Sequence, residues 1–110
     1  MKYHHIGIPT ETPRPGETYL EKLKLFATDH RDNAYGIQWM RYLPECGLPD
    51  LVKKYPHVAF EVDNLKEALE GKEVIIEPNS PSEGVMVAFI VEDGAPVELM
   101  EFLKKEDGGD

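Results

Sequence analysis

The segment VELMEFL at residues 97–103 decides the fold, because an earlier part of the chain repeats its pattern. The segment IQWMRYL at residues 37–43 has the same order: an apolar residue, Gln or Glu, a bulky apolar residue, Met, a charged residue, an aromatic residue and Leu. Upstream of each, HIGI at residues 5–8 corresponds to HVAF at residues 57–60. Two matches in the same order indicate an internal duplication.

Local patterns predict the elements that carry these matches. Asp63 or Asn64 is placed to cap a short helix over residues 65–70. Residues 17–28 fit a helical turn and a strand equally well, and residues 44–56 have the Pro and Gly content of a linker. Short runs of branched and aromatic residues predict strands at 3–8, 37–43, 57–62, 73–77, 85–91 and 97–103.

These elements and the duplication predict an α+β fold built of two related modules. A single domain would span residues 1–110. The first module, residues 1–46, is abbreviated, whereas the second, residues 55–104, is complete. A chain of 110 residues with 41% hydrophobic residues is long enough for one such domain with a modest core.

Charge and composition exclude several function classes. The formal net charge of −9 argues against nucleic-acid and anionic-membrane partners, because both need patches of Lys and Arg. No run of residues reaches the roughly 18 apolar residues of a membrane span, and the N-terminus has no apolar signal core. The single cysteine, Cys46, cannot form an internal disulfide, so we expect a cytoplasmic location.

Alternation along the matched strands brings four polar side chains to equivalent positions. His5 and His57 are the first residues of the matched segments 5–8 and 57–60. Gln38 and Glu98 are both the second residues of the matched segments 37–43 and 97–103. If the two halves pack about a pseudo-twofold axis, these four residues converge on one point. Their mixed nitrogen and oxygen ligands suit a divalent Zn, Ni, Co, Mn or Fe ion. Glu98 also needs a partner, because burying a carboxylate on an apolar strand is costly.

Three further polar residues are predicted to lie away from this point. His4 is adjacent to His5 in the strand, so it should face the opposite side and be solvated. His30 lies in a polar turn and should also be solvated. Arg41 falls on the face away from Gln38, which favours a surface or interface role.

The matched segments resemble the vicinal oxygen chelate superfamily, which includes glyoxalase I, methylmalonyl-CoA epimerase, extradiol dioxygenases and bleomycin-resistance proteins. HIGI at residues 5–8, HVAFEVDNL at 57–65, VAFI at 87–90 and DGAPVELME at 93–101 carry the resemblance. It implies two βαβββ-type modules, the first abbreviated, that form a curved mixed sheet around a metal-binding pocket. It also implies that one residue from each of four strands holds a metal, and by position these are His5, Gln38, His57 and Glu98. This ligand order is similar to the epimerase branch, whereas the dioxygenases use two His and one Glu.

The resemblance also implies a function. We expect a divalent-metal-dependent isomerase, epimerase or lyase, of the lactoylglutathione lyase or epimerase type, that transfers a proton next to a chelated carbonyl of a small molecule. Glu98 could be the base, and Glu61 is a second candidate on the face of His57. An Fe(II) dioxygenase and a non-catalytic, resistance-type binding protein are the alternatives. Short members of the superfamily commonly complete their sheets across a twofold axis, so we also expect a homodimer.

Overall fold

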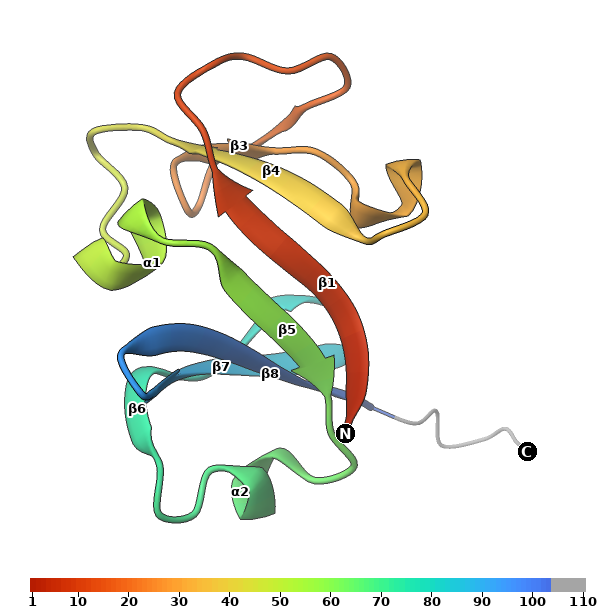
Figure 1. Ribbon diagram of the computed structural model, residues 1–110, viewed down its shortest axis with the longest axis vertical. Coiled ribbons are helices and arrows are strands. Elements are labelled where there is room, and N and C mark those ends of the chain that lie inside the picture. Colours follow the sequence, from red (N-terminus) through yellow and green to blue (C-terminus); the bar gives the residue numbers. More distant parts are fainter. Residues whose placement is uncertain (104–110) are drawn as a thin grey trace.

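A computed structural model describes residues 1–103, which form one curled mixed sheet with few helical segments (Figure 1). The strands are β1 (Lys2–Pro9), β2 (Thr18–Leu20), β3 (Leu25–Ala27), β4 (Ile37–Tyr42), β5 (His57–Glu61), β6 (Glu73–Ser82), β7 (Val85–Glu92) and β8 (Ala95–Phe102). The helical segments are η1 (His30–Asp32), α1 (Asp50–Lys54) and α2 (Leu65–Ala68). The predicted α+β class with a curved mixed sheet is confirmed. The last residues of the predicted domain, 104–110, lie outside the described residues.

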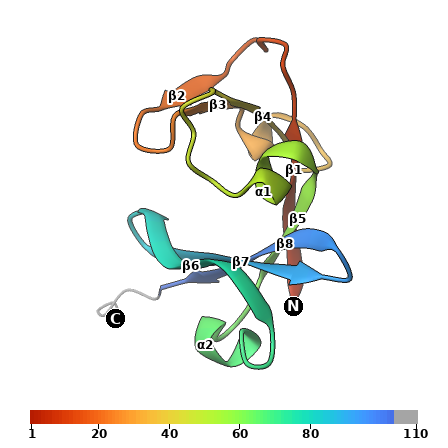
Figure 2. The same ribbon diagram turned by 90° about the vertical axis from the view of Figure 1, so that its left-hand side faces the viewer.

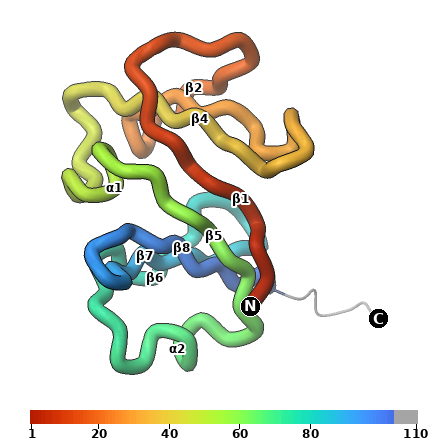
Figure 3. The backbone as a smooth tube through the Cα atoms, viewed as in Figure 1, coloured from red at the N-terminus to blue at the C-terminus, as the bar shows by residue number. Residues whose placement is uncertain are grey.

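The eight strands are arranged with pseudo-twofold symmetry. Their order, β2-β3-β4-β1-β5-β8-β7-β6, is the same from both edges when β1 to β4 are equated with β5 to β8. At the centre β1 and β5 run antiparallel side by side (Figure 3), with Gly7 opposite His57. Gly7 also pairs with Gln38 across β1 and β4, as Ala59 pairs with Glu98 across β5 and β8. The register therefore relates the two halves in the same way as the sequence match.

The structure differs from the expected elements in three places. Residues 17–28, where the pattern was ambiguous, form the short antiparallel hairpin of β2 and β3. The predicted linker contains α1, which lies between the two halves of the sheet and buries Val52 (Figure 2). Five helical residues are too few to show a helical period in the sequence. Strand β6 continues five residues beyond the predicted strand at 73–77, to Ser82, because its irregular pairing with β7 at the sheet edge tolerates proline.

The two faces of β7 and β8 pack in two separate hydrophobic clusters. On one face Leu65 of α2 packs on Ala88, Ile90 and Leu99, and these four buried residues form one core cluster. On the other face Val85, Val87 and Met100 form a separate buried cluster with Ala59 of β5. Helix α2 begins where the Asn64 side chain accepts a hydrogen bond from the Glu67 N–H, as the capping pattern predicted. Over residues 1–103, no helix combines the length and the hydropathy needed to cross a membrane.

Candidate metal centre

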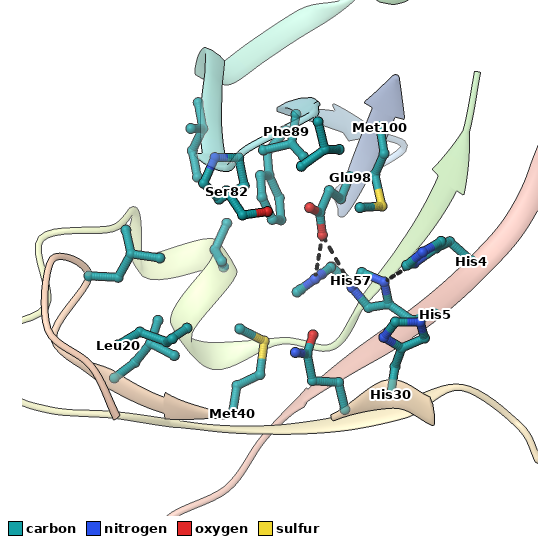
Figure 4. A pocket seen from close by; sticks show the side chains of 18 of the residues that line it. His4, His5, Leu20, His30, Met40, His57, Ser82, Phe89, Glu98 and Met100 are labelled. Atoms are coloured by element: carbon teal, nitrogen blue, oxygen red, sulfur yellow. Dashed lines mark hydrogen bonds and ion pairs between the residues drawn. The ribbon is translucent and has the colours of Figure 1, made fainter. Parts of the chain in front are cut away.

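A cavity of about 660 Å³ lies between the two halves of the sheet. Five imidazole and carboxylate side chains gather at one end of it (Figure 4): His4, His5, His30, His57 and Glu98. The rest of the lining is mainly apolar and comes from both halves, including Leu20, Leu23, Leu25, Met40, Leu48, Val52, Ile76, Val85, Val87, Phe89, Met100 and Phe102. The cavity thus has one polar end and a large apolar body.

Three of the four predicted ligand residues meet at the polar end. The Oε1 atom of Glu98 lies 3.1 Å from Nε2 of His57 and 3.3 Å from Nε2 of His5. All three side chains are buried, with exposed fractions of 2% for His57, 5% for His5 and 8% for Glu98. One ligand atom from each residue lies within 4.8 Å of the others. Two imidazoles and one carboxylate facing a common point fit the donor preferences of a divalent transition metal.

The carboxylate of Glu98 is held in its charged form. Burial raises the pKa of Glu98, but the hydrogen bonds and the charges of His5 and His57 outweigh burial and lower it to about 2. Glu98 is therefore ionised at neutral pH, as a metal ligand or a proton acceptor must be.

The ring of His57 is fixed by packing. A Cβ atom at Gly7 would lie 2.3 Å from Cε1 of His57, so the ring occupies the space that a side chain at position 7 would need. Phe89 contacts the ring edge-on, with the two centroids 4.9 Å apart. Among the described residues, Nδ1 of His57 has no hydrogen-bond partner. Only glycine at position 7 allows this placement.

The fourth predicted ligand, Gln38, lines the same cavity. Its side-chain Nε2 donates a hydrogen bond to the backbone oxygen of Thr28 at 3.0 Å, which leaves the amide oxygen as the atom suited to a metal. Thr28 is buried, and its hydroxyl accepts a hydrogen bond from the Trp39 N–H at 2.8 Å. Sequence reasoning missed Thr28, because it acts on Gln38 through a backbone atom that no residue type signals.

The prediction that His4 and His30 are solvated away from the site is wrong, because both line the cavity. The pairing of β1 with β5 shifts register between Tyr3 and His5, and this β-bulge makes His4 an extra residue that breaks the alternation. Nδ1 of His4 lies 2.8 Å from Nδ1 of His5, and its ring centroid is 4.4 Å from that of His30. Burial, followed by the neighbouring charges of His5 and His30, lowers the pKa of His4.

Two other predicted residues lie outside the cavity. Glu61 is half-buried at the end of β5, paired with Lys2 in the register, and is not one of the lining residues, whereas Glu98 is. Arg41 lies away from the cavity, as predicted, where its guanidinium pairs with the Glu17 carboxylate and stacks over the Phe26 ring at 4.2 Å.

Comparison with known proteins identifies the fold. No protein-family model matches the sequence, and no curated protein matches it significantly. Among solved structures, a hypothetical protein from Bacillus halodurans matches with a TM-score of 0.68 and 21% identity, over 99% of this chain and 98% of that one. Methylmalonyl-CoA epimerase from Mycobacterium tuberculosis matches with a TM-score of 0.59 and 18% identity, over 94% and 89%.

A glyoxalase family protein from Bacillus cereus matches with a TM-score of 0.43 and 15% identity, over 94% of this chain and 95% of that one. The first two likenesses have TM-scores above 0.5 and span nearly the whole chain. The chain therefore has the fold of the vicinal oxygen chelate superfamily.

Proposed function

We propose that the protein is a divalent-metal-dependent enzyme that transfers a proton at the carbon next to a chelated carbonyl group of a small molecule. The convergence of His5, His57 and Glu98, with ligand atoms within 4.8 Å of one another, is the main support. Gln38 completes the proposed ligand set from the same cavity. A Zn, Ni, Co, Mn or Fe ion bound there would supply Lewis acidity toward the carbonyl oxygen.

We assign the proton transfer to Glu98. Its carboxylate is ionised and lines the cavity, whereas Glu61 lies outside the lining. The other lining carboxylate, Asp29, accepts hydrogen bonds from the backbone N–H of Arg31 and from two nitrogens of its guanidinium, the closest at 2.7 Å. One structural neighbour is a methylmalonyl-CoA epimerase, and epimerisation requires a proton transfer of this kind. That likeness favours the reaction class without naming a substrate.

The lining of the cavity favours a substrate with an apolar body. Leucine, valine, methionine and phenylalanine side chains form most of the wall beyond the polar end. Among the described residues that line the cavity, Arg31 is the single Lys or Arg side chain, and its guanidinium is already paired with Asp29. A substrate would therefore present its chelating oxygens to a metal held by His5, His57 and Glu98 and place an uncharged group against the apolar wall.

Incubation in D₂O tests the reaction class. The zinc-loaded protein would be screened against 2-oxoaldehyde thiol adducts, acyl-CoA epimers, ketoses and catechols, each with polar and apolar substituents. We expect deuterium at the α-carbon of product or recovered substrate with wild type, and none with Glu98→Gln. Activity that requires Fe(II) and consumes O₂ in step with product would replace this proposal with the dioxygenase alternative. Tight ligand binding without exchange would favour a binding protein.

We further propose a homodimer. Within the described residues, β2 and β6 each have a hydrogen-bonded neighbour on one side only. Strand β2 is exposed along its length, and Tyr19 and Leu20 are 42% and 37% exposed. An exposed apolar edge is a site for pairing with another chain. Light scattering at micromolar concentration would test this proposal, and a monomer would contradict it.

The proposed location is the cytoplasm, because the thiol of Cys46 is buried and free, as in proteins of reducing compartments. Recovery of the protein from a periplasmic or secreted fraction would contradict this location.

A further inference from the structure

We propose that His4 is a positioning residue for the metal centre: its Nδ1 accepts a hydrogen bond from Nδ1–H of His5 and thereby holds Nε2 of His5 toward the site. The inference rests on the proposed metal-dependent function. The two Nδ1 atoms lie 2.8 Å apart, while Nε2 of His5 lies 3.3 Å from Oε1 of Glu98 (Figure 4). His5 thus has one ring nitrogen engaged by His4 and the other directed at the ligand cluster.

The chemistry of imidazole decides which residue donates. Two ring nitrogens at hydrogen-bond distance require one N–H and one lone pair. A metal-ligating nitrogen must present its lone pair, so His5 in that role carries its proton on Nδ1. Nδ1 of His4 is then the acceptor in the metal-bound protein, whereas without metal Nε2–H of His5 donates to Glu98. Ligating histidines usually donate this second hydrogen bond to a carboxylate, a backbone oxygen or water, and such partners fix the orientation of the ring.

His4 is itself held in place, as a positioning residue must be. The β-bulge between Tyr3 and His5 turns the His4 side chain to the cavity side. Its ring contacts those of His30 and Phe102, with centroid distances of 4.4 Å and 5.5 Å. Gly36 approaches the bulge closely, because a Cβ atom added at position 36 would lie 3.1 Å from the backbone oxygen of His4. These contacts define the position of the His4 ring on several sides.

Two amide substitutions of similar size test the hydrogen bond separately from packing. His4→Asn places an amide atom near the position of Nδ1 and can still accept from His5. His4→Gln places its amide near the position of Nε2 and cannot. Both variants and the wild-type chain would be titrated with Co²⁺ by calorimetry and visible absorption, after thermal melts of the metal-free proteins show that all three fold. We expect His4→Gln to weaken Co²⁺ binding about tenfold and His4→Asn to stay within about twofold of wild type.

Nitrogen-15 spectra of the zinc-loaded proteins give a second measurement. We expect a slowly exchanging imidazole N–H of His5 in wild type and His4→Asn, and its loss in His4→Gln. Wild-type affinity together with a retained N–H signal in His4→Gln would overturn the inference. Equal weakening by both substitutions would also overturn it, because packing alone would then explain the effect. Failure of the wild-type chain to bind Co²⁺ would instead remove the proposed metal centre itself.

Discussion

The two halves of the sheet hold equivalent histidines in different ways. In the second half, the His57 ring lies against Gly7 and Phe89, and Nδ1 has no partner among the described residues. In the first half, His5 pairs across the strands with Ala59, which carries the Cβ atom that Gly7 lacks. Nδ1 of His5 is instead hydrogen-bonded to His4.

This difference shows which features the pseudo-twofold arrangement shares between the halves and which it does not. The strand register keeps both histidines at symmetric positions, but the register alone does not fix the orientation of a ring. The second half has long strands and a packed core behind it, and packing holds His57. The first half has two three-residue strands, β2 and β3, and its histidine depends on an irregularity in β1. Disturbing the packing around the His57 ring should therefore affect both stability and metal binding, whereas disturbing His4 should affect mainly metal binding.

The largest effect is expected from Gly7→Ala. The new Cβ would overlap the His57 ring, so the ring must leave its position or the strands must separate. We expect a loss of Co²⁺ affinity of about a hundredfold and a destabilisation of about 1–3 kcal/mol. Urea denaturation and calorimetric titration would measure the two effects. Gly47→Ala is the matched control, because nothing lies within 4 Å of a Cβ at Gly47. Unchanged binding by Gly7→Ala would show that packing on Gly7 does not fix His57.

The second prediction concerns Glu98, which both histidines share. Its pKa is about 2 in the folded chain and 4.5 without these contacts, so the ionised form stabilises the fold. This stabilisation is fully present above pH 4.5 and is lost as the pH falls toward about 2, with a total of about 3 kcal/mol.

Urea denaturation of the metal-free wild type across this pH range should show the decline, and Glu98→Gln should flatten that part of the profile. Identical pH profiles for the two proteins would contradict the assignment of a depressed pKa to Glu98.

A smaller effect is expected from Phe89→Leu. The substitution removes the edge-on contact with the His57 ring but keeps a buried apolar side chain. We expect a destabilisation of about 1 kcal/mol and a several-fold loss of Co²⁺ affinity, because the ring loses one of its two fixed neighbours. Titration of Phe89→Leu beside His4→Gln would compare the two means of holding a ligand. A stability loss in Phe89→Leu without any loss of affinity would mean that Gly7 alone is sufficient.

The smallest effect is expected from Asn64→Ala, which removes the side-chain cap of α2. This helix has no counterpart in the first half, and it packs on the face of β7 and β8 away from the cavity. We expect the free energy of unfolding to fall by about 1 kcal/mol in a thermal melt, and the Co²⁺ affinity to equal that of wild type. A clear loss of Co²⁺ affinity would show that α2 supports the metal site from the opposite face of the sheet.

The parts of the structure that depend on repetition and alternation could be predicted from the sequence. The match of residues 37–43 with 97–103 indicated the pseudo-symmetric fold, and the alternation along the predicted strand 97–103 placed Glu98 with the two histidines that it meets in the structure. The same alternation placed Gln38 beside them, and Gln38 lines the same cavity.

The features that depend on a break in a pattern could not be predicted. The bulge beside His5 shifts one residue, and no residue type in KYHHIGIP marks it, so His4 was placed on the wrong face. His30 reaches the cavity only because η1 folds back toward His4, and this contact between distant parts of the chain has no local signal. Thr28 acts on Gln38 through its backbone oxygen, which every residue possesses.

Calorimetric titration of Co²⁺ into wild type, His5→Ala and His57→Ala tests most directly whether the two halves build one metal centre. The ligand atoms of His5, His57 and Glu98 converge within 4.8 Å, so one ion should bind per chain and each substitution should weaken binding at least about tenfold. Wild-type affinity in either variant, or a stoichiometry of two ions per chain, would contradict a single centre shared between the halves.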